Sequence, residues 1–179
     1  MRRIWSPWRM EYIAGERKAG CVFCDTSQQD HDPDNLILLR AEHCFVMLNR
    51  YPYNNGHLMV VPFVHVDSPA HLPPAALLEM MNLVNICLEV LGEAMHPEGF
   101  NVGMNLGTPA GAGIADHMHM HVVPRWTGDT NFMPVLGETR VIVEALEASY
   151  RKLRPLFDCR CDALLRPRTT AEDAEAGRA

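Results

Sequence analysis

Three histidines separated by single apolar residues are the strongest chemical signal in this sequence of 179 residues. They are His117, His119 and His121, in the run DHMHMHVVPR. On an extended strand, successive side chains point to opposite faces, so the three imidazoles share one face and the intervening methionines point to the other. A single histidine is commonly structural, but three in strict alternation indicate a functional site.

Two kinds of chemistry could use such a face. Neutral imidazole is a common metal ligand, and histidines two residues apart on a strand can converge on one zinc ion. Alternatively, one imidazole can attack a phosphorus atom to form a covalent intermediate. The glycine-rich loop at 107–113 favours phosphorus chemistry, because main-chain N–H groups at Gly111 and Gly113 can approach oxyanions closely. Arg125 would add positive charge nearby.

A second chemical signal is the C-x₂-C pair formed by Cys21 and Cys24. This spacing lets two thiolates occupy adjacent corners of a tetrahedron, so the pair is half of a zinc site and needs two further ligands. Cys159 and Cys161 do not have this spacing. A redox role is disfavoured because no βαβ pattern follows the pair, and two buried thiols without metal are the remaining alternative.

The alternation of histidines with apolar residues resembles the histidine triad (HIT) superfamily of nucleotide hydrolases and transferases. The resemblance extends over residues 21–126 and includes the upstream elements Leu48-Asn49-Arg50, Gly56-His57 and Asn105-Leu106-Gly107. It implies a HIT-like α+β fold and a reaction at the α-phosphorus of a nucleotide.

The resemblance also implies roles for individual side chains. His119 would be the nucleophile that forms a covalent nucleotidyl-histidine intermediate, and His121 would take part in the reaction beside it. His57 would lie behind the nucleophile and support it. Asn49 would contact the ribose hydroxyls, and Asn105 would lie near the α-phosphate.

For the C-x₂-C pair, the resemblance supplies the two missing ligands. In zinc-containing members these are a histidine shortly after the third strand and the first histidine of the triad. They correspond here to His65 and His117, which with Cys21 and Cys24 would hold a structural zinc ion.

The sequence departs from the common family pattern just before the triad. Many members carry Gln followed by Ser or Thr at the positions that are Gly113 and Ile114 here. A hydroxyl contact to phosphate is therefore not expected, and main-chain N–H groups around Gly113 would have to replace it.

The flanking sequences indicate a branch of the superfamily. Residues 5–12 and 123–132 are similar to the bacterial diadenosine tetraphosphate (Ap4A) phosphorylase-like branch, whereas the smaller phosphoramidase branch usually lacks them. The implied reaction is attack on Ap4A with release of ATP, then displacement of AMP by phosphate to give ADP. With water as the second nucleophile the site would be a hydrolase. The alternatives are a nucleoside phosphoramidase or nucleotide hydrolase, and a non-catalytic zinc-stabilised nucleotide-binding protein.

The elements that position these residues follow from periodicity and turn signals. Apolar residues at steps of three and four, such as Leu77, Met81 and Leu88, predict a long helix over 74–95 and place them on its core face. A last amphipathic helix is predicted over 138–153. Strands are predicted at 36–40, 43–49, 57–62, 100–106 and 117–123. The fold class is α+β, with a mainly antiparallel sheet of about five strands.

Composition limits domain number and partners. Hydrophobic residues make up 47% of the chain, enough for the core of one domain over 21–155. We expect an N-terminal extension over 1–20 and a C-terminal tail over 156–179, disordered from about 165. Acidic residues outnumber basic ones by 22 to 16, which disfavours a nucleic-acid or anionic-membrane binder.

The sequence also supports expectations about localisation and oligomeric state. Trp5, Pro7 and Trp8 interrupt what would be the apolar run of a signal peptide, so we expect a cytoplasmic protein. Apolar stretches elsewhere fall short of the roughly 20 residues that a membrane span requires. The resembled family commonly forms homodimers by pairing helices and extending the sheet, which implies an interface on the apolar helix over 74–95.

Overall fold

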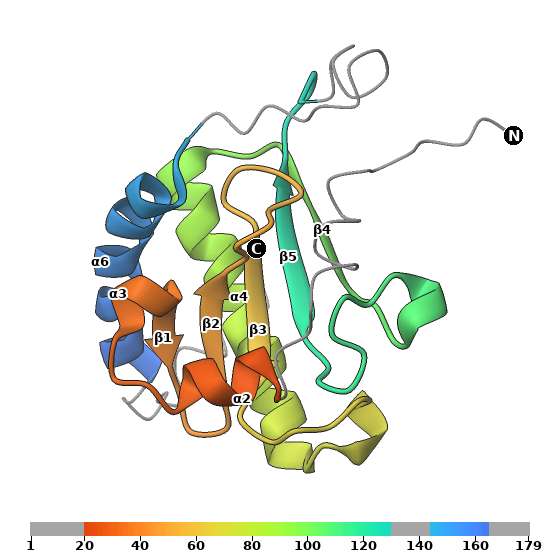
Figure 1. The fold of residues 1–179 in the computed structure, drawn as a ribbon. Coiled ribbons are helices and arrows are strands. Elements are labelled where there is room, and N and C mark those ends of the chain that lie inside the picture. Colours follow the sequence, from red (N-terminus) through yellow and green to blue (C-terminus); the bar gives the residue numbers. More distant parts are fainter. Residues whose placement is uncertain (1–19, 130–143, 165–179) are drawn as a thin grey trace, which may run out of the picture.

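A five-stranded antiparallel sheet organises the part of the chain that the computed structural model describes, residues 20–129 and 144–164 (Figure 1). The strand order is β1-β2-β3-β5-β4, so β5 lies inside the sheet between β3 and β4. The predicted sheet is confirmed. Its strands are β1 (Ile37–Arg40), β2 (Cys44–Leu48), β3 (Leu58–Pro62), β4 (Gly99–Met104) and β5 (Met120–Arg125).

The turn between β2 and β3 places His57 beside the triad. Gly56 has a φ of +70°, a conformation that glycine adopts without the strain of a side chain, and it ends the turn YPYNNG. β3 then pairs with β5 so that Met59 lies opposite His121. His57, which immediately precedes β3, is therefore carried to the middle of the sheet.

The triad begins before the strand that was predicted to carry all of it. β5 starts at Met120, and the N–H group of Met118 donates to the carbonyl of Val66, 2.7 Å away, in the loop after β3. The alternation of side chains still holds. Met118, Met120 and Val122 lie in the main core, and the three histidines face the other way.

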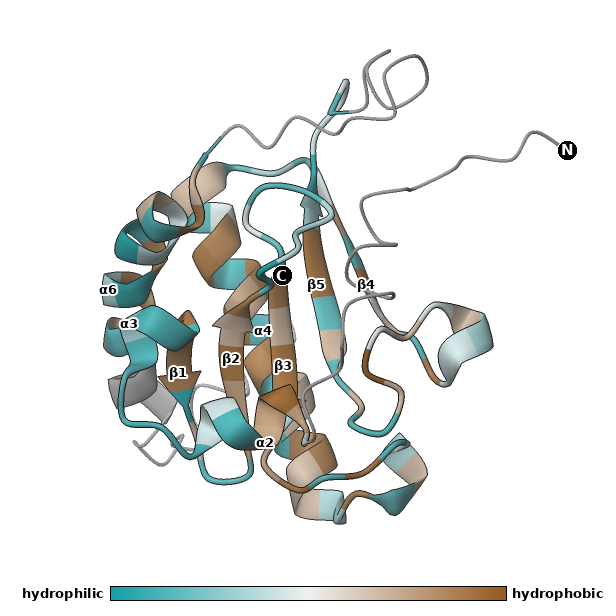
Figure 2. Ribbon diagram, viewed as in Figure 1, coloured by the Kyte–Doolittle hydropathy of each residue, from teal (hydrophilic) through white to brown (hydrophobic). Residues whose placement is uncertain are grey.

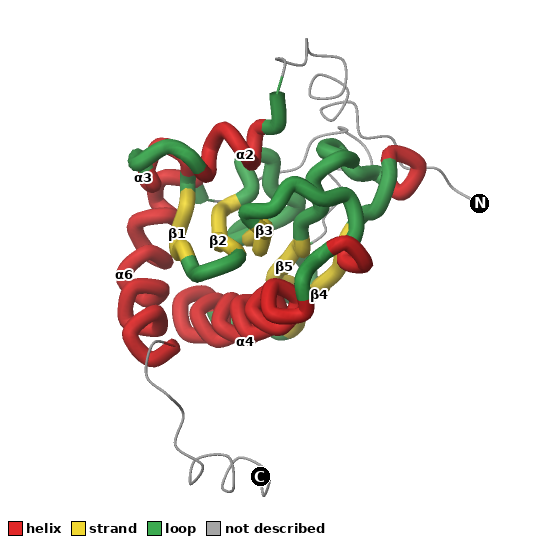
Figure 3. Tube along the Cα trace, turned by 90° about the horizontal axis from the view of Figure 1, so that it is seen from below, coloured by secondary structure: helices red, strands yellow, loops and turns green. Residues whose placement is uncertain are grey.

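Helices cover both faces of the sheet. α4 (Pro74–Met95) crosses one face with α6 (Leu146–Leu164) beside it, and α2 (Val22–Ser27) lies on the opposite face (Figure 3). The main core lies between the sheet and α4, where the ribbon is predominantly hydrophobic (Figure 2). A smaller cluster that includes Phe23, Phe45 and Met59 lies on the other face. The remaining helical segments are α3 (Asp32–Asn35), η1 (Pro69–His71) and η2 (Thr108–Ala110).

α4 has the predicted bounds, and the face predicted to be in the core is only partly buried. Val84 and Leu91 of that face are buried, Leu77 and Leu88 are partly buried, and Met81 is 48% exposed. The buried side extends onto a neighbouring row of residues that also follows steps of three and four, so periodicity alone could not choose between two adjacent apolar faces. The buried residues of α4 are Ala76, Met80, Leu83, Val84, Ile86, Cys87, Val90 and Leu91.

α4 is also, among the described residues, the one helix long and apolar enough to cross a membrane by length and composition. Its buried face packs against the sheet, which is how the core helix of a globular domain is built. The length and apolar composition of α4 therefore follow from its place in the core.

α6 extends beyond the predicted C-terminal helix. It begins at Leu146 and ends at Leu164, with Pro155 inside it, whereas the prediction ended at residue 153. Proline usually ends a helix because it lacks an N–H group, but Leu153 and Phe157 on either side of it are both fully buried. The helix therefore crosses the boundary expected at 155. Residues 1–19 of the expected extension over 1–20, the start of the predicted helix at 138–143 and the tail from 165 lie outside the described residues.

Candidate active site and metal site

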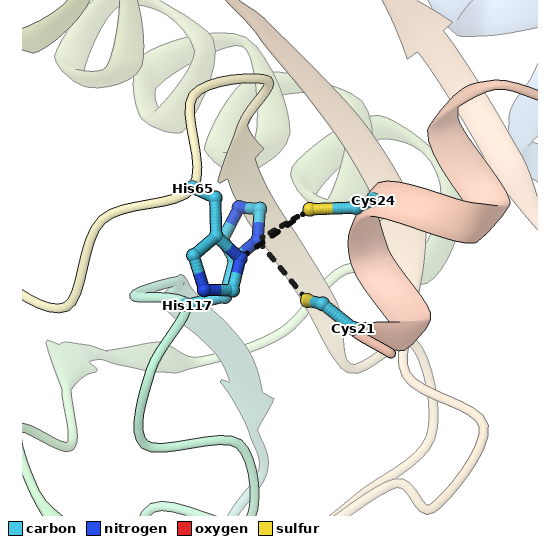
Figure 4. Close-up of side chains that lie close together, drawn as sticks. All are labelled: Cys21, Cys24, His65 and His117. Atoms are coloured by element: carbon cyan, nitrogen blue, oxygen red, sulfur yellow. Dashed lines mark hydrogen bonds between the residues drawn. The ribbon is translucent and has the colours of Figure 1, made fainter. Parts of the chain in front are cut away.

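Four sulfur and nitrogen ligands from three segments meet at one end of the sheet (Figure 4). Cys21 and Cys24 lie at the start of α2, His65 follows β3, and His117 precedes β5. Their ligand atoms all lie within 4.8 Å of one another. The sequence therefore predicted correctly that these four residues would come together.

The distances within this group fit a tetrahedral ion. Sγ of Cys21 is 3.3 Å from Nδ1 of His117, and Sγ of Cys24 is 3.3 Å from Nδ1 of His65 and 3.5 Å from Nδ1 of His117. Ordinary zinc–sulfur and zinc–nitrogen bond lengths give a tetrahedral edge of about 3.6 Å. The four residues are therefore almost at the separations that a bound zinc ion would require.

The protonation of His117 also suits a metal ligand. Its Nε2 lies 2.8 Å from the carbonyl oxygen of Pro62 and so donates its proton there. Its Nδ1 is left with a lone pair that faces the thiols, the arrangement of a metal-bound histidine whose other nitrogen is held by a carbonyl. Burial lowers the pKa of His117, and burial together with Cys21 raises the pKa of Cys24. A cation would offset the cost of holding that thiol as thiolate.

The main chain fixes the tautomer of His119, the expected nucleophile. Its Nδ1 lies 3.0 Å from the carbonyl oxygen of His117 and donates to it, so the lone pair is on Nε2. Burial lowers the pKa of His119, which keeps the ring neutral. Phe23, between the two cysteines, packs against the rings of His119 and His117, with centroids 5.0 and 5.4 Å away.

A chain of hydrogen bonds sets the tautomer of His121. The N–H group of Tyr53 donates to Nδ1 of His57, 3.0 Å away, so the proton of His57 is on Nε2. That Nε2 lies 3.0 Å from Nδ1 of His121 and donates to it. His121 therefore carries its own proton on Nε2. The ring of His121 packs edge-on to that of His119, with 4.7 Å between their centroids.

The two expected nucleotide-binding asparagines lie at strand ends. Asn49 follows β2, where its Oδ1 accepts from the N–H group of Tyr51 at 2.9 Å and its Nδ2 lies 3.4 Å from Nδ1 of His57. Asn105 directly follows β4 and is half-buried. Both positions are compatible with contact to a ligand, and their roles stay predictions.

The glycine-rich loop is more self-contained than expected. Gly111, with a φ of +91°, ends η2, and its N–H group donates to the carbonyl of Thr108 at 3.0 Å. This N–H group closes a turn, and the expected role of Gly111 in phosphate binding stays a prediction. Gly113 lies between η2 and the triad and is partly buried, and its expected role stays a prediction.

Arg125 lies at the end of β5, where neighbouring side chains engage it. Its guanidinium makes two hydrogen bonds to the carboxylate of Asp129, at 2.6 and 2.7 Å, and a third to Asn101 at 2.9 Å. It lies four residues beyond His121, about 13 Å along a strand. Its expected role in phosphate binding stays a prediction.

Comparison with known proteins identifies the family. The HIT domain family model matches residues 31–128. The chain belongs to the HIT family. It is 38% identical over 162 residues to the AP-4-A phosphorylase of Mycobacterium tuberculosis, covering 86% of this chain and 83% of that protein. It is also 29% identical over 105 residues to the adenylylsulfatase of Arabidopsis thaliana, covering 59% and 52%.

A solved structure supports the same assignment. The crystal structure of a zinc-bound histidine triad family protein from Mycobacterium smegmatis has a TM-score of 0.62 and 26% identity, covering 80% of this HIT chain and 97% of that one. The expected HIT fold and the resemblance to the Ap4A phosphorylase branch are confirmed.

Two residues of this HIT site were missed by sequence reasoning. Phe23 lies within the C-x₂-C motif, and an apolar residue between the two cysteines indicates a side chain that packs into the core beside them. Tyr53 acts through its main-chain N–H group and through a ring that packs 4.6 Å from that of His57. A main-chain donor has no sequence signature, so this contact needed the structure.

The buried His57 should make folding stability depend on pH. Burial, reinforced by His121 and His119, lowers the pKa of His57 from 6.5 to about 2. The unfolded chain therefore takes up a proton at this residue below pH 6.5 and the folded chain does not, so stability is lost as pH falls. Between pH 7.5 and 5.5 we expect His57 to contribute a loss of about 1 kcal/mol in the free energy of unfolding.

Urea unfolding at the two pH values measures this effect. The His57→Asn variant should lose less stability than the wild type over the interval, whereas the exposed His31→Asn control should behave as the wild type. Equal losses in the wild type and in His57→Asn would contradict the assignment.

Proposed function

We propose that this protein is a nucleotidyltransferase that converts Ap4A and phosphate to ATP and ADP through a covalent nucleotidyl-histidine intermediate. The observation that carries the proposal is the fixed tautomer of His119, with its proton held by the carbonyl of His117 and its lone pair on Nε2. The similarity to the AP-4-A phosphorylase of M. tuberculosis supports the choice of substrate.

The reaction proceeds in two displacements. Nε2 of His119 attacks the α-phosphorus of Ap4A, forming a P–N bond as the P–O bond to the departing ATP breaks. The N–H group on Nε2 of His121 donates a hydrogen bond to the oxygen of the leaving group. A phosphate oxygen then attacks the same phosphorus, the P–N bond breaks, and ADP leaves while the lone pair returns to His119.

Trapping with Ap4A labelled with ³²P at the α-phosphorus tests both steps. Without phosphate, we expect label to accumulate on the protein, and with phosphate to appear as ADP. The His119→Ala variant should lose turnover at least about a thousandfold, because it removes the nitrogen on which the intermediate forms. The His31→Ala control should keep wild-type turnover. Labelled AMP both with and without phosphate would exclude a phosphorylase. Wild-type activity of His119→Ala would exclude His119 as the nucleophile.

Hydrolysis of a smaller adenylyl compound is the second candidate. It is favoured by the similarity to the adenylylsulfatase of A. thaliana and by Gly113 and Ile114, which depart from the common family residues. The ratio of kcat/KM for Ap4A to that for adenosine phosphoramidate and adenylyl sulfate separates this candidate from the first. A protein that binds nucleotides without turnover would show no activity on any of the three.

We also propose that Cys21, Cys24, His65 and His117 hold one structural zinc ion. The distances between sulfur and nitrogen atoms and the proton placement on His117 support this, as does the zinc-bound relative from M. smegmatis. With four protein ligands the coordination shell is complete, so the ion would fasten α2 to the triad without entering the reaction. Such thiolates need a reducing compartment, which supports a cytoplasmic location.

Metal analysis of the purified protein tests the zinc site. We expect one zinc per chain, at least tenfold less in Cys24→Ser, and a melting temperature lowered by several degrees in that variant. Cys159→Ser, which alters an exposed cysteine outside the group, should keep both zinc and melting temperature. A zinc-free wild type, or a Cys24→Ser variant with full zinc content, would contradict the proposal.

We further propose that the chain forms a homodimer through α4 and the edge strand β4. Leu78 and Met81 of α4 are 65% and 48% exposed, and Val102 of β4 is 43% exposed, so both elements present apolar side chains that such an interface would bury. Light scattering should give about twice the chain mass of 20.2 kDa. Leu78→Glu combined with Met81→Glu should give monomer, and the exposed Arg151→Glu should not. A monomeric wild type would end the proposal.

A further inference from the structure

Asp129 is the centre of a hydrogen-bonded cluster at the end of β5. Its side chain is only 10% exposed, and its two carboxylate oxygens receive both hydrogen bonds from Arg125. The N–H group of Trp126 donates to the same carboxylate at 3.2 Å. The indole N–H of Trp126 in turn donates to the carbonyls of Met95 and His96 at the end of α4, 3.3 and 3.2 Å away. The carboxylate is therefore fixed in position by neighbours on two elements.

Asn54 links this cluster to the turn before His57. Its Nδ2 donates to Asp129 at 2.8 Å and to the carbonyl of Pro124 at 3.1 Å. Its own carbonyl accepts from the N–H group of His57, and its Oδ1 accepts from the N–H group of Asn55. Nδ2 of Asn54 thus holds the turn against the end of β5, while its Oδ1 forms a hydrogen bond within the turn.

The residue before Asn54 contacts both His57 and His121. Tyr53, adjacent to Asn54, places its N–H group 3.0 Å from Nδ1 of His57 and its ring against both His57 and His121. If the turn moved, Nδ1 of His57 would lose the closer of its two donors, the Tyr53 N–H group at 3.0 Å, and would keep only Nδ2 of Asn49 at 3.4 Å. The tautomer of His57 would then be less strongly fixed, and so would that of His121.

We propose that Asn54 and Asp129 are positioning residues that hold the Tyr53 N–H group in place and so fix the tautomers of His57 and His121. The catalytic consequence rests on the proposed function, in which Nε2–H of His121 assists the leaving group. Arg125 contributes to this arrangement, because its two hydrogen bonds hold the Asp129 carboxylate where that group accepts from Nδ2 of Asn54. Neither Asn54 nor Asp129 touches substrate in this scheme.

Nitrogen NMR of protein labelled with ¹⁵N-histidine reads the tautomers directly, whether or not the protein turns over a nucleotide. In the wild type we expect both His57 and His121 as Nε2–H tautomers. In Asn54→Ala the ring nitrogens of both should shift toward averaged values, with kcat for Ap4A about tenfold lower and KM within about twofold. Asp129→Asn, which keeps the shape but loses the charge that Arg125 holds, should give a smaller shift of the same kind.

Thr127→Val is the matched control. It removes a 2.6 Å hydrogen bond to Glu98 in the same loop without touching the turn, so the ring spectrum and kcat should remain those of the wild type. Wild-type tautomers in Asn54→Ala would overturn the proposal, and if that variant does not fold, wild-type tautomers in Asp129→Asn would do so. A wild type inactive on every nucleotide would remove the proposed function, and the ring spectra would still decide the positioning role.

Discussion

The carbonyl group of His117 is the contact on which the site depends. It accepts the hydrogen bond from Nδ1 of His119 and thereby leaves the lone pair on Nε2, while the side chain of the same residue faces the two cysteines. One peptide unit therefore joins the proposed metal site to the proposed nucleophile. Alternation along an extended segment makes this possible, because it turns His117 and His119 to the same face and buries Met118 between them on the other. Rotation of the His117 peptide would disturb both functions together.

The second general feature is that the site is built from neutral groups. Burial lowers the pKa values of His57 and His119, so neither ring supplies positive charge to a polyphosphate near neutral pH. The chain carries a net charge of −6, and Arg125 is committed to Asp129. Oriented N–H groups are then the means by which the phosphate charge can be met, and such groups are most effective when water is excluded. Fixed tautomers matter more in such a site than in one that relies on cations.

The parts of the fold and of the site that could be predicted are those that local patterns of side chains encode. The C-x₂-C spacing and the triad are local patterns of side chains, and both led to residues that the fold brings together. Periodicity predicted the bounds of α4 but only part of its buried face, since a helix apolar on two sides packs according to its neighbours. The predicted C-terminal helix ended at 153, whereas burial of Phe157 accompanies the continuation of α6 to Leu164. Arg125 pairs with Asp129, four residues later in the chain, a contact that the strand and triad patterns do not encode. The hydrogen bond from Tyr53 belongs to the main chain and has no sequence signal.

The triad is anchored from two sides by contacts of different kinds. On one side, the proposed zinc ion would fasten the first turn of α2, while Arg40 holds the other end of that helix by donating to the carbonyls of Ser27 and Gln29. Phe23, inside α2, packs against His119 between these two anchors. On the other side, two asparagines hold the turn that carries Tyr53: Asn54 donates to Asp129, and Asn49 accepts from the N–H group of Tyr51. Nδ1 of His57 likewise faces two donors, the N–H group of Tyr53 and Nδ2 of Asn49. Loss of Asn54 would therefore weaken the hold on the tautomers of His57 and His121 while the contacts of Asn49 remain.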